Sequence, residues 1–229
     1  MPELQFLALD SSTDAGSVAL WRDGTVIERH CAPGQPSSAT LLPLVSALLA
    51  EAGVAFADLD AIAFAAGPGS FTGLRVACGV AQGLAFAHDL PVLPVGTLDA
   101  MAHATGVPRV AVCLDARMNE VYFGLFADGV AVSPIGVYPP EQVPLPGPGG
   151  DWVAAGNAMA AYPRLHERLV PVAASFRDEV LPTAASVAAL AAPRLARGEG
   201  IDAAAAVPVY VRDKVALTVA ERLAQGGKA

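Results

Sequence analysis

The sequence predicts an α/β protein made of two related halves. Its apolar runs are ordered as three strands, a helix, and then alternating strands and helices. This order begins again 105 residues later, and five identities within 16 residues support a duplication: Leu9, Asp10, Leu20, Asp23 and Gly24 correspond to Leu114, Asp115, Leu125, Asp128 and Gly129. Leucine and Asp-Gly are common in hairpins, so two unrelated hairpins are the alternative.

The first half contains three strands before its first helix, because Asp23-Gly24 joins two β-rich runs as a hairpin. Pro43 is placed in the first turn of that helix, where proline is tolerated. The expected strands are 5–10, 16–21, 25–30, 59–66 and 91–95, and the expected helices are 40–52, 74–87 and 98–104.

The second half repeats the strands but holds a proline-rich loop at 139–150. Pro163 should break its first helical stretch and Pro193 should kink its last. The expected strands are 111–115, 121–126, 130–137, 152–155 and 170–173, the helical stretches are 157–169 and 183–197, and 207–211 is extended. We expect an N-terminal subdomain at 1–105, a C-terminal subdomain at 106–212 and a tail at 213–229.

Composition excludes several classes of protein. The chain is 54% hydrophobic and 16% charged, which is incompatible with intrinsic disorder. No apolar run approaches the about 20 residues of a membrane span. The net charge is −8, and the only lysines are Lys214 and Lys228, so strong direct binding to nucleic acid is not expected. Three widely spaced cysteines and a start without signal-peptide features favour a cytoplasmic protein.

A glycine-rich loop at 67–73 lies between a predicted strand and a predicted helix. Backbone N–H groups at such a turn can bind an anion, but the loop has neither the G-x-G-x-x-G nor the Walker A spacing. The alternative is a tight turn in which Ser70 or Thr72 caps the helix. Together with the end of the first strand, the loop gives a possible nucleotide or phosphate site: Asp10, Ser11, Ser12, Thr13, Gly67, Gly69, Ser70, Thr72 and Gly73.

The second hairpin argues against a working nucleotide site, because residues 115–119 contain no glycine and place Arg117 in the loop. The four histidines show no metal-binding spacing, and no cysteine lies near another. We expect no catalytic residue and no metal site.

The helices at 40–52 and 74–87 predict a subunit interface. The first is apolar on every side except for Glu51, and the second carries a stripe of Gly79 and Gly83 that lets another helix approach. Arg75 either faces an acidic partner or is solvated. Burial inside a larger α/β core is the alternative, and the expected interface residues are Leu41, Leu44, Val45, Leu48, Arg75, Val76, Gly79, Val80 and Gly83.

Four stretches carry a resemblance to a known family: 7–20, 67–85, 114–122 and 208–212. With these motifs the chain resembles the TsaB (YeaZ) family over nearly its whole length. The resemblance implies the duplicated actin/Hsp70-like fold (ASKHA, ribonuclease H-like) with two subdomains. It also implies a non-catalytic subunit that binds and activates TsaD in forming N6-threonylcarbamoyladenosine in tRNAs that read codons beginning with adenine.

The resemblance further implies TsaE as a partner, a pathway link to TsaC, a homodimer when the chain is alone, and contact with tRNA only through the complex. ATP or ADP is expected only in the complex. Thr97 and Met101 stand where TsaD has its metal-binding histidines, and Ser37 or Ser38 stands where TsaB relatives often have a histidine. The competing interpretations are a kinase-like ATPase or metallopeptidase-like enzyme of the same fold, and a direct tRNA-binding module.

Overall fold

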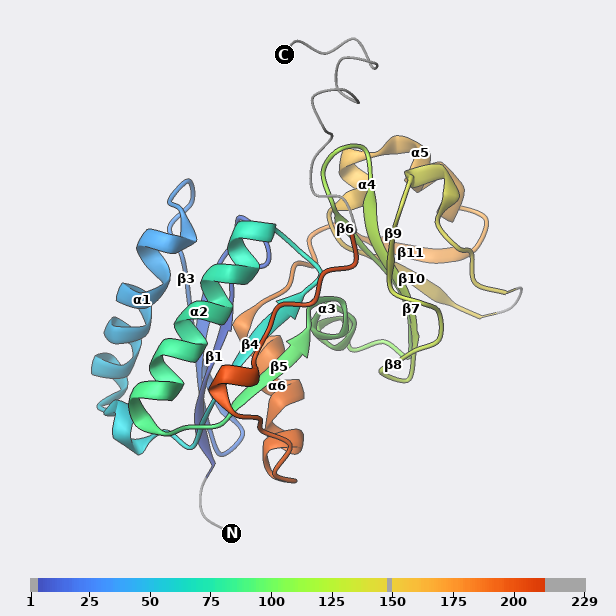
Figure 1. Ribbon diagram of the computed structural model, residues 1–229. Coiled ribbons are helices and arrows are strands. Elements are labelled where there is room, and N and C mark those ends of the chain that lie inside the picture. Colours follow the sequence, from blue (N-terminus) through green and yellow to red (C-terminus); the bar gives the residue numbers. More distant parts are fainter. Residues whose placement is uncertain (1–3, 148–149, 213–229) are drawn as a thin grey trace, which may run out of the picture.

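Two β-sheets lie side by side, with helices between and around them (Figure 1). The structure is a computed structural model that describes residues 4–147 and 150–212, so the predicted tail at 213–229 lies outside the described residues. The strands are β1 (Gln5–Asp10), β2 (Ser17–Arg22), β3 (Thr25–His30), β4 (Ala61–Gly67), β5 (Val92–Gly96), β6 (Arg109–Asp115), β7 (Val121–Ala127), β8 (Val130–Ala131), β9 (Gly136–Tyr138), β10 (Trp152–Ala155) and β11 (Ala173–Arg177). The helices are α1 (Ser37–Ala52), α2 (Phe71–His88), α3 (Thr97–Thr105), α4 (Ala158–Ala161), α5 (Pro163–Leu169) and α6 (Ala184–Leu195), with short 3-10 turns at Phe56–Asp58, Pro140–Gln142 and Ala203–Ala205.

The first sheet has the order β3-β2-β1-β4-β5. Its β1 strand is central, antiparallel to β2 and parallel to β4, so that Leu7 lies opposite both Leu20 and Ile62. Side chains alternate across a strand, and both faces of β1 are therefore apolar and covered. Leu7 and Leu9 point toward α1 and α2, whereas Phe6 and Ala8 pack toward α6.

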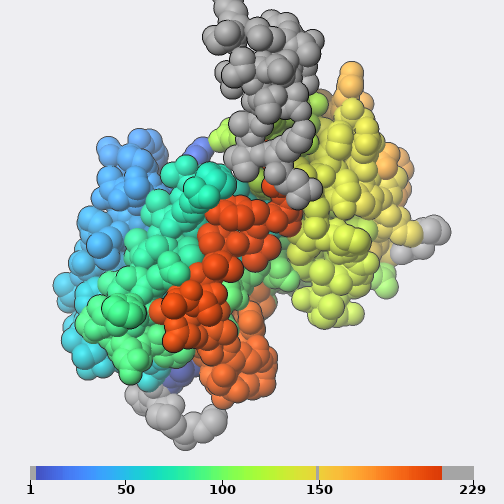
Figure 2. All heavy atoms as spheres, in the orientation of Figure 1, coloured from blue at the N-terminus to red at the C-terminus, as the bar shows by residue number. Residues whose placement is uncertain are grey.

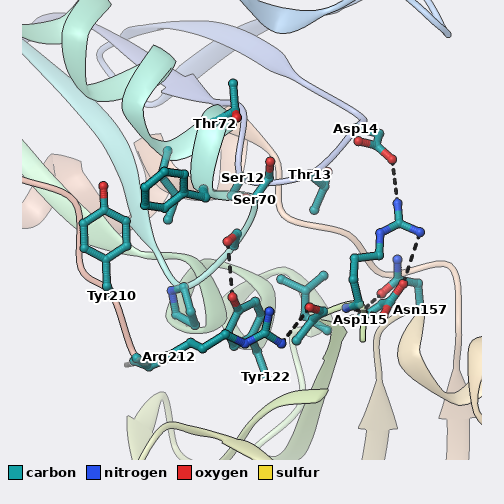
Figure 3. A pocket seen from close by; sticks show the side chains of 18 of the residues that line it. Ser12, Thr13, Asp14, Ser70, Thr72, Asp115, Tyr122, Asn157, Tyr210 and Arg212 are labelled. Carbon is teal, nitrogen blue, oxygen red and sulfur yellow. Dashed lines mark hydrogen bonds and ion pairs between the residues drawn. The ribbon is translucent and has the colours of Figure 1, made fainter. Parts of the chain in front are cut away.

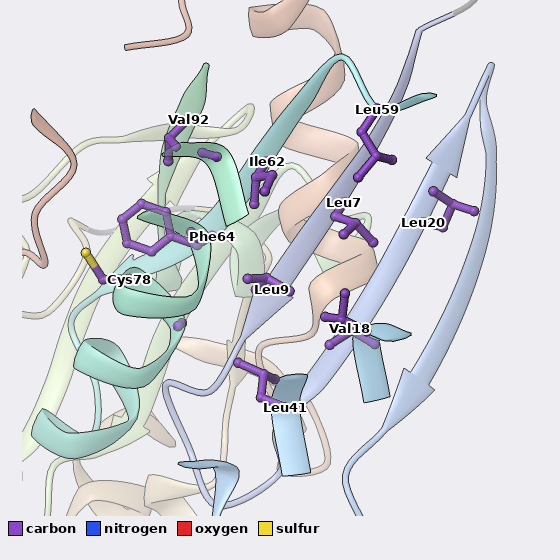
Figure 4. Packing of buried hydrophobic residues seen from close by; sticks show 14 of the residues in the cluster. Leu7, Leu9, Val18, Leu20, Leu41, Leu59, Ile62, Phe64, Cys78 and Val92 are labelled. Carbon is purple, nitrogen blue, oxygen red and sulfur yellow. The ribbon is translucent and has the colours of Figure 1, made fainter. Parts of the chain in front are cut away.

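The main core lies between this sheet and the pair α1 and α2 (Figure 4). Leu41 of α1 and Ile62 and Phe64 of β4 are fully buried there. Burying a side chain of this size contributes roughly 1.5–3 kcal/mol, so this cluster fixes the two helices on the sheet.

The second sheet repeats the order of the first as β8-β7-β6-β10-β11, with β9 also paired to β7. The directions agree as well, because β6 is antiparallel to β7 and parallel to β10. The predicted duplication is therefore confirmed by topology, and the chain has an α/β fold with two subdomains.

Two helices are exchanged between the halves. Helix α3 comes from the first half, yet Leu98 and Met101 pack with Val112 of the second sheet. Helix α6 comes from the second half, yet Val187 and Ala188 pack on the first sheet. The boundary at residue 105 separates the two sets of strands, whereas in space α6 and Ala203–Ala205 lie with the first sheet.

Several elements of the first half differ slightly from the expectation. Helix α1 begins at Ser37, so Pro43 lies inside the helix and not in its first turn. Helix α2 begins at Phe71, where the Ser70 Oγ accepts a hydrogen bond from the Gly73 N–H at 3.3 Å. The predicted capping role of Ser70 is confirmed.

The second half contains two wrong strand predictions. The expected strand 130–137 is split into β8 and β9, because Pro134 has no N–H and the Ser133 Oγ accepts the Leu125 N–H at 2.9 Å. The expected strand 170–173 is a turn, since the Val172 N–H bonds back to the Leu169 carbonyl, and β11 starts at residue 173. Pro163 separates α4 from α5, as predicted.

Candidate functional site

A cavity of about 440 Å3 lies between the two subdomains (Figure 3). Three loops form most of its wall: the β1–β2 hairpin, the loop from β4 to α2, and the β6–β7 hairpin. The C-terminal segment 209–212 completes it. Five of the nine predicted phosphate-loop residues line the cavity, namely Ser12, Thr13, Gly69, Ser70 and Thr72, whereas Asp10, Ser11, Gly67 and Gly73 lie behind them.

The β1–β2 hairpin ends in a buried polar cluster. Asp10 and Ser12 are at most 1% exposed, and the Asp10 Oδ1 accepts the Ser12 N–H at 2.7 Å. Within the described residues, the Asp10 Oδ2 and the Ser12 Oγ have no hydrogen-bond partner. Burial raises the pKa of Asp10 above its ordinary value, because the carboxylate loses its hydration and the hydrogen bonds from Ser12 compensate only in part.

The glycines of the 67–73 loop serve close packing against this hairpin. A Cβ at Gly69 would lie 2.6 Å from the Ser12 carbonyl oxygen, and a Cβ at Gly73 would overlap the Ser11 carbonyl oxygen. The Ser70 N–H donates to the Ser12 carbonyl oxygen at 2.7 Å. Two of the three predicted glycines therefore hold the loop on the hairpin.

The β6–β7 hairpin forms the opposite wall in an unusual backbone conformation. Arg117, Met118 and Asn119 are three consecutive non-glycine residues with φ between 55° and 58°. Each such residue costs roughly 1–2 kcal/mol, so the loop needs support from its surroundings. Asp115 supplies some of it, because its Oδ1 accepts the Arg117 N–H at 2.8 Å and the Tyr162 hydroxyl at 2.7 Å.

Two contacts cross the cavity from one subdomain to the other. The Arg117 guanidinium pairs with Asp14 at 2.7 Å, and the Tyr122 hydroxyl donates to the Gly69 carbonyl oxygen at 3.4 Å (Figure 3). Burial of Tyr122 raises its pKa, and burial of Tyr162 together with its hydrogen bond to Asp115 raises the pKa of Tyr162 to about 12. Both phenols are therefore neutral hydrogen-bonding groups near pH 7.

The segment 206–212, which we call the strap, runs along α2 toward the second subdomain (Figure 2). The Val209 N–H donates to the Ala66 carbonyl at 2.7 Å. The Tyr210 hydroxyl accepts the Arg75 Nε at 3.0 Å, and the Arg212 guanidinium donates to the Ala116 carbonyl at 2.8 Å. The motif at 208–212 carries part of the family resemblance, but no local sequence pattern indicates that its side chains line the cavity.

The predicted interface residues fall into three groups. Leu41, Val45 and Leu48 are fully buried in the chain's own core, because they face the sheet; they have no surface for a partner. Leu44, Val76 and Val80 are partly buried, and Arg75, Gly79 and Gly83 are exposed. A Cβ added at Gly79 or Gly83 would meet no atom within 4 Å.

The alternative, in which both helices are buried inside a larger α/β core, is wrong for the isolated chain. The outer side of α1 and α2 is open: Leu42 is 46% exposed and Phe86 is 85% exposed. We call this surface the α1/α2 face; its members include Leu42, Pro43, Ser46, Ala47, Thr72, Arg75, Gly79, Gly83 and Phe86.

The residues support only part of a nucleotide site. The serine-containing hairpin, Gly69 and the N-terminus of α2 line one wall, although the Ser12 Oγ itself is buried. The other wall presents Arg117 and Met118 where a phosphate would need glycine. Thr97 and Met101 are fully buried in α3, and the described part of the chain holds no group of three side chains suited to bind a metal. No helix in the described ranges is long and apolar enough to cross a bilayer.

Similar proteins agree with this architecture. Residues 34–218 match the family described as TsaD, tRNA N6-adenosine threonylcarbamoyltransferase. The tRNA threonylcarbamoyladenosine biosynthesis protein TsaB of Escherichia coli is 36% identical over 226 residues, which cover 93% of this chain and 96% of that protein. The TsaB of Haemophilus influenzae is also 36% identical, over 94% of this chain and 96% of that protein.

A solved structure, YeaZ from Pseudomonas aeruginosa, superposes with a TM-score of 0.81 at 42% identity and covers 90% of this chain and 99% of its own. The architecture is thus the duplicated α/β fold of the actin/Hsp70-like (ASKHA) class. Identity at this level over nearly the full length of both chains, together with the shared fold, means that this chain belongs to the TsaB (YeaZ) family.

Proposed function

We propose that this chain takes part in tRNA threonylcarbamoyladenosine biosynthesis as a non-catalytic subunit that binds and activates TsaD through its α1/α2 face. The names of its relatives supply the pathway. The observation that carries the binding role is the open glycine stripe on α2, which is flanked by the exposed side chains of Phe86 and Leu42.

The α1/α2 face has the features of a helix-docking surface. Gly79 and Gly83 are four residues apart and an added Cβ at either would meet no neighbouring atom, so a partner helix can come close to the backbone of α2. The fully buried side of α1 already holds the helix on the sheet. The outer apolar side chains are thus not needed for folding and are free to be buried by a partner.

The same face accounts for the proposed homodimer of the isolated chain, because an apolar face without its partner pairs with a second copy. TsaE, TsaC and the tRNA act with the assembled complex in this proposal, and the net charge of −8 agrees with tRNA contact through other subunits.

A substitution on the stripe tests the docking role. Gly83→Leu adds to the stripe a side chain that meets nothing within this chain, so the fold is retained and association with TsaD is lost. Glu167→Leu is the matched control, since it adds the same side chain to an exposed position of α5 in the other subdomain. Light scattering after size exclusion measures both complexes, and unchanged binding by Gly83→Leu would exclude this face.

A reconstituted assay tests the activating role. Purified TsaD, TsaE and TsaC with ATP, threonine, bicarbonate and tRNA are assayed for modified adenosine with and without this chain. Modification should require the chain and should fail with Gly83→Leu. Full modification without the chain would refute the proposal.

The competing function is a kinase-like enzyme of the same fold, and the inter-subdomain cavity, with Gly69 and the N-terminus of α2 in one wall, is the observation that favours it. Calorimetric titration of ATP and ADP into the chain alone and into its complex with TsaD separates the two. The proposal expects nucleotide binding only in the complex, whereas binding and turnover by the chain alone would support the enzyme.

A further inference from the structure

The Arg75 side chain contacts two aromatic side chains. Its Cζ lies 3.7 Å from the centroid of the Phe71 ring, and its Nε donates to the Tyr210 hydroxyl at 3.0 Å. Within the described residues, no carboxylate lies within salt-bridge distance of this guanidinium. Arg212, two residues beyond Tyr210, instead pairs with Glu120 at 2.6 Å.

Two aromatic rings fix the position of this guanidinium. The rings of Phe71 and Tyr210 lie 5.4 Å apart, and Arg75 contacts both, with its Cζ 5.9 Å from the centroid of the Tyr210 ring. The strap holds Tyr210 in place, because the Val209 N–H bonds to the Ala66 carbonyl. A guanidinium that is already stacked loses little conformational entropy on binding, and its terminal nitrogens are still able to donate.

Arg75 also begins the open stripe on α2. Residues 75, 79 and 83 are spaced four apart and therefore lie along one side of the helix, and all three are exposed. A helix that packs over the two glycines runs directly past Arg75. A carboxylate on that helix can then form two parallel hydrogen bonds with the guanidinium.

We propose that Arg75, positioned by Phe71 and Tyr210, recognises a carboxylate side chain on the docked helix of the partner protein. The inference rests on the proposed function and names the chemistry of the partner at the same face. Charge complementarity supports it, since Arg75 supplies a positive charge on a surface whose other named members are uncharged. An RNA phosphate fits less well, because the glycine stripe and Phe86 beside it suit an apolar helix and the chain is acidic overall.

Affinity for TsaD tests the inference. Arg75→Gln should weaken binding by about tenfold or more, mainly through faster dissociation, because it removes the charge and the paired donors. Arg75→Lys should be intermediate, since it keeps the charge but loses the planar pair of donors. Tyr210→Phe should weaken binding only a few-fold, because the ring remains and the hydroxyl is lost.

Arg164→Gln is the matched control, because it removes an exposed arginine from α5 in the other subdomain and should leave affinity unchanged. Added salt should weaken binding of the unsubstituted chain more than binding of Arg75→Gln, which a purely structural role of Arg75 would not produce. Thermal melting of each variant checks that the fold is retained.

The outcomes separate this inference from the proposed function. If the unsubstituted chain does not bind TsaD, the proposed function fails. If it binds, and Gly83→Leu abolishes binding while Arg75→Gln binds as tightly as the unsubstituted chain, only the present inference fails. If Arg75→Gln loses self-association but keeps its affinity for TsaD, the guanidinium binds a second copy of this chain. If Arg75→Gln loses only tRNA binding, the guanidinium binds a phosphate. Either result overturns the inference.

Discussion

The outer face of the N-terminal sheet carries two long helices, α1 and α2, whereas the corresponding face of the C-terminal sheet carries the short α4 and α5 between β10 and β11. Where α1 lies in the first half, the second has the proline-rich segment 139–150. The strand order is the same in both. The two halves thus share the order of their strands but differ in their helices. The α1/α2 face occurs on the half that has two long helices.

The two equivalent hairpins show a second difference. Asp10 is fully buried beneath the 67–73 loop without a cation, whereas Asp115 is paired with Arg117 and accepts the Tyr162 hydroxyl. The first hairpin is held by close backbone packing on glycine, and the second by side-chain hydrogen bonds that support three residues of positive φ. Equivalent positions in a repeat therefore do not have equivalent chemistry.

The largest predicted effect concerns the exchanged helices. Ala188→Glu puts a charge into the contact of α6 with the first sheet and should lower the free energy of unfolding by about 3 kcal/mol or more. Because α3 and α6 cross between halves, both halves should lose stability together. Trp21 lies in the first half and Trp152 in the second, so the fluorescence of Trp21→Phe and Trp152→Phe backgrounds reports each half separately.

Ala47→Glu is the control for this substitution, since Ala47 is exposed on α1. If Ala188→Glu shifts only the transition that Trp21 reports, the halves are independent folding units and the exchange does not couple them.

The second prediction compares two glycines of α2. Gly73→Ala should destabilise the chain by roughly 1–3 kcal/mol, because the new methyl group overlaps the Ser11 carbonyl oxygen. Gly83→Ala should stabilise it by about 0.5–1 kcal/mol, since the site is open and alanine favours a helix. Urea denaturation measures both, and equal effects of the two substitutions would contradict the packing role of Gly73.

The smallest effect concerns the two hairpin carboxylates. The folded-state pKa of Asp10 is raised, so the native state binds more protons than the unfolded state, and the free energy of unfolding falls as pH rises from about 3.8 through that raised pKa. Asp10→Asn should remove this decline. The gain in free energy of unfolding over the unsubstituted chain should therefore be larger at pH 7 than at pH 4. Asp115→Asn should instead destabilise it by about 1 kcal/mol, because it weakens the bonds to Arg117 and Tyr162.

Thermal unfolding across this pH range measures the difference between the two variants. A loss of stability in Asp10→Asn at pH 7 would mean that the buried carboxylate is compensated after all.

The α/β class, the duplication and most strands follow from the amino-acid sequence, because apolar periodicity and Asp-Gly turns are local signals. The break at Pro163 and the glycine stripe at 79 and 83 follow from it as well, and Ser70 is one of the two helix caps that it offers. The strand expected at 130–137 failed on a local feature, Pro134, which interrupts the ladder.

The remaining features depend on contacts between segments that are distant in the sequence. Periodicity shows that a helix is apolar but not which side of it meets the sheet. The sequence therefore predicts Leu41, Val45 and Leu48 at a subunit interface, whereas these residues belong to the chain's own core. The exchange of α3 and α6, the cavity between hairpins 105 residues apart, and the contact of Tyr210 with Arg75 all join segments distant in sequence. Such contacts depend on how the sheets pack, and no local pattern encodes them.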